Sequence, residues 1–103
     1  MLVVTTEKIS GKDFEELGIV TGSTIQCKNI GRDIGSSFRN LVGGEMKSYV
    51  EMMDKAREVA YARMVENASR MGADAVVCMR LATSAIAAGA SEVTAYGTAV
   101  KFK

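Results

Sequence analysis

The hydrophobic and polar residues of this chain divide it into short extended runs and one long amphipathic segment. Residues 2–5 are mostly apolar and β-branched, which predicts a first short strand. Within residues 14–27, Ile19, Ile25 and Cys27 share one face of any extended segment, which predicts a second strand. We therefore expect the chain to begin with two strands joined by a polar loop.

Two segments near these strands have weaker helical patterns. Asp13 is a good N-cap, so a helical turn at residues 13–16 is an alternative to the start of the second strand. In residues 29–42, apolar residues three or four positions apart form one stripe of a helix. Two glycines inside that segment each cost about 1 kcal/mol relative to alanine, so we expect this helix to be short or irregular.

Residues 45–71 predict one long helix. They contain no glycine or proline, and their apolar residues recur with a period near 3.6. Gly72 stands where a left-handed C-terminal cap belongs. At about 1.5 Å per residue this helix is roughly 40 Å long, whereas a compact domain of this size is about 33 Å across. We therefore expect the helix to overhang its own domain and to be covered by further copies of the chain.

The C-terminal third predicts two more strands. Residues 73–81 form a nearly continuous apolar run, in which one face should carry Ala75, Val77, Met79 and Leu81. Residues 84–91 are small and suit a hairpin tip. Residues 93–102 follow as the last strand, with small residues on one face that allow a helix to approach closely. The order of elements predicts an α+β fold, a mainly antiparallel sheet with one long helix laid across one face.

Composition and charge narrow the classes of function. The chain has 103 residues, of which 48% are hydrophobic and 24% charged, and a formal net charge of +1. This length fits one packed domain over residues 1–103, and the weak net charge argues against nucleic acid or an anionic membrane as partner. No apolar run approaches the roughly 20 residues that cross a bilayer, and the start has no secretory pattern. We therefore expect a cytoplasmic protein.

Residues that carry chemistry are few. The chain has no histidine, and its two cysteines, Cys27 and Cys78, form no CxxC pair, so we find no catalytic triad and expect no enzyme activity. We expect both thiols to be reduced and buried in the core. A soft-metal site built on these thiolates is the alternative, although Met79 beside Cys78 should point to the opposite face of the sheet.

The best candidate cluster for binding lies on the glycine-containing segment and comprises Asn29, Arg32, Asp33 and Arg39. It combines a capping side chain, anion-binding guanidinium groups and a carboxylate within a short stretch. Arg32 and Asp33 are adjacent, so on a helix they face different directions and suit different partners. We favour ion pairing within the chain or across a subunit interface, with ligand binding as the alternative.

Several short motifs follow one another in order along almost the whole chain: VTG at residues 20–22, NIGRD at 29–33, Arg39, VGGE at 42–45, Tyr49, AREVA at 56–60, GADAVV at 72–77 and YGTAVK at 96–101. Together they resemble the YbjQ-like family of small bacterial and archaeal proteins, described as heavy-metal-binding. The resemblance implies a dodecin-like α+β subunit that assembles into a homopentameric ring. It assigns no metal ligands here, because Cys27 and Cys78 lie outside the matching motifs.

From the residues and the resemblance we expect a non-enzymatic binding or scaffold module. It would work as a homo-oligomeric ring, holding a soft metal ion or a small ligand at the interfaces between subunits. A purely structural oligomer without a ligand is the first alternative. A thiol-dependent redox protein is the second, and it requires at least one thiol that reacts readily in the native protein.

Overall fold

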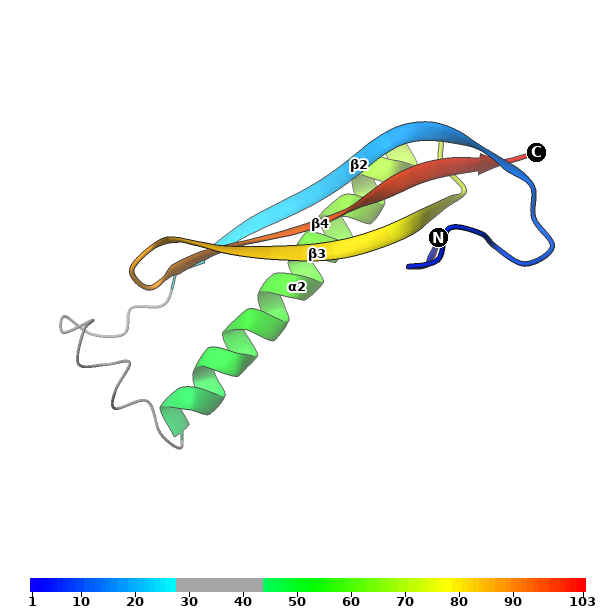
Figure 1. Cartoon of the computed structure of the whole chain (residues 1–103). Coiled ribbons are helices and arrows are strands. Elements are labelled where there is room, and N and C mark those ends of the chain that lie inside the picture. Colours follow the sequence, from blue (N-terminus) through cyan, green and yellow to red (C-terminus); the bar gives the residue numbers. More distant parts are fainter. Residues whose placement is uncertain (28–43) are drawn as a thin grey trace.

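A computed structural model of the chain describes residues 1–27 and 44–103, and the side chains of its long helix are described from Lys47 onward. In chain order the elements are β1 (Leu2–Val3), β2 (Phe14–Cys27), α2 (Gly44–Arg70), β3 (Ala75–Ala87) and β4 (Ala90–Phe102). The four strands form one sheet in the order β1-β3-β4-β2 (Figure 1). Helix α2 lies across one face of this sheet.

The predicted α+β class is confirmed, and the sheet is mixed. β2 and β3 each pair with β4 in antiparallel fashion, as expected from the sequence. β1 instead runs parallel to β3, with Leu2 opposite Ala75. The alternative helical turn at residues 13–16 is wrong, because β2 already begins at Phe14. The helix predicted over residues 29–42 lies outside the described residues.

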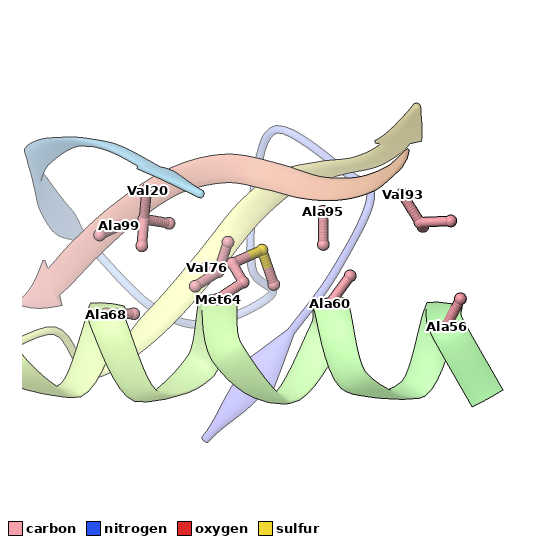
Figure 2. Close-up of a cluster of buried hydrophobic side chains, with 9 residues drawn as sticks. All are labelled: Val20, Ala56, Ala60, Met64, Ala68, Val76, Val93, Ala95 and Ala99. Carbon is pink, nitrogen blue, oxygen red and sulfur yellow. The ribbon is translucent and has the colours of Figure 1, made fainter. Parts of the chain in front are cut away.

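The core between helix and sheet depends on one stripe of α2. Its four buried residues recur every fourth position, close to the helical repeat, and are Ala56, Ala60, Met64 and Ala68. They pack against the small face of β4, which carries Val93, Ala95 and Ala99. Val20 of β2 and Val76 of β3 complete this core (Figure 2). Three of the four helix residues are alanines, so the helix backbone lies close to the strands. The predicted small face of the last strand is the one that contacts the helix.

α2 and β2 approach each other closely at Gly22. A Cβ atom added there would lie 2.1 Å from the Met64 amide nitrogen and 2.5 Å from the Ala60 carbonyl oxygen. Both of these atoms belong to the helix backbone, which cannot move aside as a flexible side chain can. The VTG motif therefore has a packing role, since a residue with any side chain at position 22 would push the helix off the sheet.

The end of α2 confirms the cap expected at Gly72. This glycine has a φ angle of 81°, in the left-handed region, and its N–H donates to the Ser69 carbonyl. The Ala73 N–H donates to the Ala68 carbonyl at 3.1 Å, which completes a Schellman motif. The chain then turns directly into β3, so the cap fixes where the helix meets the sheet.

A β-bulge in β3 overturns the predicted alternation of its side chains. Val77 pairs with Thr98 and Arg80 pairs with Tyr96, so two residues of β3 lie opposite Gly97. The bulge includes Cys78, whose φ angle of 56° is unusual for a residue with a side chain. Val77 shares the face away from the helix with Ala75, as predicted, but after the bulge Met79 packs against the helix-side core instead of sharing that face.

The molecule is elongated. Its Cα radius of gyration is 17.1 Å and its principal extents are 55 × 21 × 15 Å, whereas a compact domain of this length has a radius of gyration near 13 Å. The buried stripe of α2 begins only at Ala56. The turns of α2 before this residue diverge from the sheet (Figure 1). The overhang predicted from the helix length is therefore present in the fold.

We predict that Gly22→Ala destabilises the protein by about 2 kcal/mol or more, because the new methyl group overlaps the backbone of α2. Thr21→Ala is the matched control, since Thr21 is exposed on the same strand and should change stability by less than about 1 kcal/mol. Urea unfolding at one fixed protein concentration measures both. Equal stability of the two variants would contradict the close helix–strand contact.

Candidate functional site

The face of the sheet away from α2 is covered at one end. There the N-terminal segment folds over the strands, and Val4, Ile9 and Phe14 pack against a second small core made by Ala75, Val77 and Val100. Beyond this cover, described residues of the face are exposed. The exposed part of this face contains Ile19, Ile25 and Tyr96, and we call it the open sheet face.

The exposed fractions on the open sheet face are large for apolar side chains. Ile19 is 80% exposed, Ile25 55% and Tyr96 40%. The register places them on the same side, because Thr21 lies opposite Tyr96 and alternate residues of β2 share a face. Large exposed apolar residues gathered on one face of a folded chain are typical of a surface that another protein covers.

Polar groups are interspersed among these apolar residues. The hydroxyls of Ser23 and Thr94 hydrogen-bond across the strands at 2.9 Å. Glu92 lies opposite both Ile25 on β2 and Ser84 on β3. The open sheet face thus combines apolar side chains with hydroxyls and a carboxylate, a composition that suits contact with protein.

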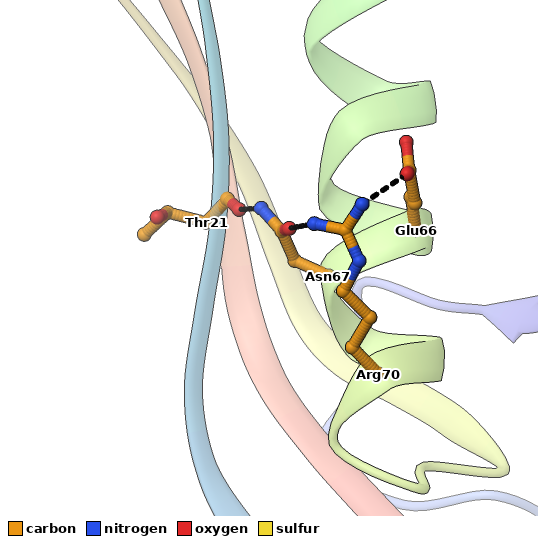
Figure 3. A network of polar contacts seen from close by, with 4 residues as sticks. All are labelled: Thr21, Glu66, Asn67 and Arg70. Carbon is orange, nitrogen blue, oxygen red and sulfur yellow. Dashed lines mark hydrogen bonds and ion pairs between the residues drawn. The ribbon is translucent and has the colours of Figure 1, made fainter.

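The free edge of β2 is partly occupied by side chains of α2. The Asn67 side-chain amide donates to the Thr21 carbonyl at 2.8 Å, and the Arg63 guanidinium donates to the Ser23 carbonyl at 2.7 Å. Arg70 in turn donates to the Asn67 side-chain oxygen and pairs with Glu66 (Figure 3). These contacts satisfy backbone acceptors that an edge strand would otherwise present to another chain.

The edge of β3 is covered along only part of its length. The Cys78 and Met79 amides donate to the Thr6 and Val4 carbonyls, and the Arg80 guanidinium donates to the Thr5 carbonyl at 3.0 Å. Residues 81–87 follow, all exposed, and none of the described strands pairs with their outer edge. We call residues 81–87 the open β3 edge.

Two hollows lie at opposite ends of the molecule. One, about 750 Å³, is formed by the loop at residues 8–14. The other, about 340 Å³, lies between Tyr49 of α2 and the β3–β4 hairpin at residues 85–91. Neither hollow is enclosed, and the described residues contain no group of three or more His, Cys, Asp or Glu side chains placed to hold a metal ion.

The two cysteines lie far apart. Cys27 pairs with Ala90 at the end of β2, whereas Cys78 lies in the bulge opposite Gly97. Ala90 and Gly97 are seven positions apart along β4, a span of roughly 23 Å. One ion bound directly to both thiolates needs sulfur atoms within about 2.3 Å of it. The two thiols of one chain therefore cannot share a metal ion.

The expectation that both thiols are buried is wrong for Cys27, which is exposed, and Cys78 is half-buried. Exposure of Cys27 follows from its position on the open sheet face, where alternate residues of β2 point away from the helix. Cys78 packs against the small outer core, and its thiol lies 3.8 Å from the Thr6 carbonyl oxygen. Met79 points to the other face, as predicted.

The cluster predicted for binding lies outside the described residues, and this holds for Asn29, Arg32, Asp33 and Arg39. Sequence reasoning also missed the residues that close the β2 edge. Arg63 and Asn67 are four positions apart, so they lie on the same side of α2, next to its apolar stripe. This spacing could have predicted that both side chains reach the neighbouring strand. The open sheet face had a signal too, since apolar residues occupy both faces of β2, as Ile19 beside Val20 illustrates.

These features define an α+β chain in which one face of the sheet is packed against the helix and the other is exposed in part. Residues 1–103 match the family model YbjQ_1, described as "Putative heavy-metal-binding". The chain belongs to this family.

Curated relatives extend over nearly the same length. A UPF0145 protein of Clostridium perfringens is 59% identical over 100% of this chain and 98% of its own length. A UPF0145 protein of the archaeon Methanosarcina acetivorans is 54% identical over 98% of this chain and 96% of its own length. The fold is also similar to the crystal structure of a DUF74-family protein of unknown function from Pediococcus pentosaceus. That match has a TM-score of 0.66 and 13% identity, and it covers 100% of this chain and 98% of the other.

We predict that an alkylating reagent modifies Cys27 faster than Cys78 in the native protein, because Cys27 is exposed and Cys78 packs in the bulge. Mass spectrometry of Cys27→Ser and Cys78→Ser, each with one remaining thiol, separates the two rates. Denaturation in urea should make them similar. A faster reaction at Cys78 in the native protein would contradict the packing described here.

Proposed function

We propose that this chain is a non-enzymatic binding or scaffold module that works as a homo-oligomer, with the open sheet face covered by neighbouring copies. The family resemblance adds a closed ring of five subunits to this proposal. In the described part of the chain no helix is both long and apolar enough to span a membrane. A cytoplasmic location stays a prediction.

The observation that carries this proposal is the exposure of Ile19, Ile25 and Tyr96 on one side of the sheet. Burying a side chain of this size contributes about 1.5–3 kcal/mol. The helix-side core is at the same time narrow, because much of it is alanine. A subunit with a thin core and an open apolar face gains stability from association with copies of itself.

A soft metal ion at the subunit interface is the more specific form of the proposal. Thiolates are the preferred donors for soft metals, and the family description names heavy metals. Because Cys27 and Cys78 cannot meet in one chain, a site with two or more thiolates has to combine cysteines from different copies. Exposed Cys27 is the better placed of the two for such sharing.

We predict that Ile19→Glu reduces the assembled mass in light scattering coupled to size exclusion. The charge at this position, 80% exposed in the subunit, would be buried without a partner in the interface. Ala62→Glu is the control, because Ala62 is exposed on α2, away from the open sheet face. The control should retain the mass of the wild-type protein.

An assembly that forms equally well with Ile19→Glu would place the interface elsewhere on the subunit. Far-UV circular dichroism of both variants checks that the subunit remains folded. Since Ile19 makes little contact within its own chain, we expect unchanged secondary structure in both.

Metal analysis tests the more specific form. Protein purified without an affinity tag should contain a soft metal ion in a fixed ratio to assembled subunits, and Cys27→Ser should lose it. Cys78→Ser, the matched control, should keep most of the metal. Absence of metal from all three proteins, after exposure to zinc and copper(I), would leave the structural oligomer without a ligand.

A further inference from the structure

β2 forms one border of the sheet, and its own sequence does little to protect that border. The strand order β1-β3-β4-β2 leaves the outer edge of β2 without a partner strand in the part of the chain that the structure describes. Charged residues and proline commonly protect such edges, but residues 17–27 contain neither. Residues 19–25 are mostly β-branched and neutral, a composition that favours pairing with strands of other chains.

The protection of this edge comes from α2. The Asn67 side-chain amide donates to the Thr21 carbonyl at 2.8 Å, and the Arg63 guanidinium donates to the Ser23 carbonyl at 2.7 Å. Backbone groups alternate in direction along a strand, so both carbonyls point outward and those of Gly22 between them face β4. A strand added at this edge would need the same two acceptors. We call Arg63 and Asn67 the edge clasp.

An ion pair on α2 fixes the orientation of the clasp. Arg70 donates to the Asn67 side-chain oxygen at 3.3 Å, which turns the NH₂ group of Asn67 toward Thr21 (Figure 3). Arg70 also pairs with Glu66 at 2.5 Å. The two charged side chains are 70% and 62% exposed, so their pairing contributes little to stability. Its effect is to hold Asn67 in the orientation that occupies the edge.

We propose that the edge clasp prevents the β2 edges of two copies of the chain from pairing, and so restricts association to other surfaces. Without the clasp, β2 of a second copy is the expected partner. The neutral residues 17–27 can lie antiparallel to themselves across a two-fold axis without like charges opposite one another. The clasp acts on the backbone edge and not on the open sheet face, so this inference stands or fails independently of the proposed function.

Arg63→Ala combined with Asn67→Ala removes both donors and lowers the formal net charge from +1 to 0. Arg57→Ala is the matched control, because it removes the same charge from α2 at a residue that pairs with Asp54 on the helix itself. In sedimentation velocity, the double variant should form species of about twice the wild-type mass or more, in a proportion that rises with protein concentration. The control should keep the wild-type mass.

Hydrogen exchange read at single residues shows whether the larger species form through this edge. In the wild-type protein the outward amides of Thr21 and Ser23 should exchange rapidly at every concentration, whereas those of Gly22 and Thr24 should be protected because they face β4. In the double variant, protection of Thr21 and Ser23 should appear together with the larger species.

A second variant covers the case in which the alanine variant does not fold. Arg63→Met combined with Asn67→Leu keeps the size of both side chains but removes their N–H donors, and Arg57→Met is its control. Far-UV circular dichroism identifies the folded variants. A folded double variant with the wild-type mass at every concentration would overturn the inference.

Three other results would also overturn it. Growth of the control to the same extent would attribute the larger species to the lost charge. Larger species without protection of Thr21 and Ser23 would place the new contact elsewhere. Protection of these two amides in the wild-type assembly alone would show that another strand already occupies the edge. A wild-type protein that is monomeric at every concentration would instead overturn the proposed function and leave the clasp to be decided by the variants.

Discussion

The close contact between α2 and the β2–β4 pair sets the shape of this subunit. Gly22 and the alanine stripe of α2 bring the helix backbone close to the strands, so the helix settles over β2 and β4 and barely contacts β3. The helix covers one face of the sheet and leaves much of β3 without helix contacts. The opposite face is covered in part by the N-terminal segment, and Ile19, Ile25 and Tyr96 are exposed there. The function is best sought on these exposed surfaces.

The same geometry limits the chemistry available to one chain. Its two thiols lie at different heights along the sheet, and the described residues gather no group of metal donors. Among the described residues, therefore, Cys27 has no further donors with which to complete a metal site. In the proposed function, assembly and metal binding are therefore linked, because the binding site would form only when the copies assemble. In a symmetric oligomer, the same side chain from several copies can meet at one site. A chain with few metal-binding groups could bind a metal ion in this way.

The sequence predicted the features that depend on local periodicity. The long helix, its cap at Gly72 and the small face of the last strand follow from spacing and backbone preference alone. The parallel pairing of β1 and the bulge at Cys78 arise from contacts between distant segments, which no local pattern encodes. Exposure of Cys27 escaped prediction for a related reason, since an apolar residue on the exposed face of a strand has the same sequence pattern as one buried within the chain.

Sedimentation velocity of the untagged wild-type protein over a dilution series tests the central claim, that the subunit is incomplete without copies of itself. The account predicts a closed assembly with a mass several times 11.0 kDa at micromolar concentration. On strong dilution it should give way to an unstable, elongated monomer. A stable, compact 11.0 kDa species at every concentration would contradict the account.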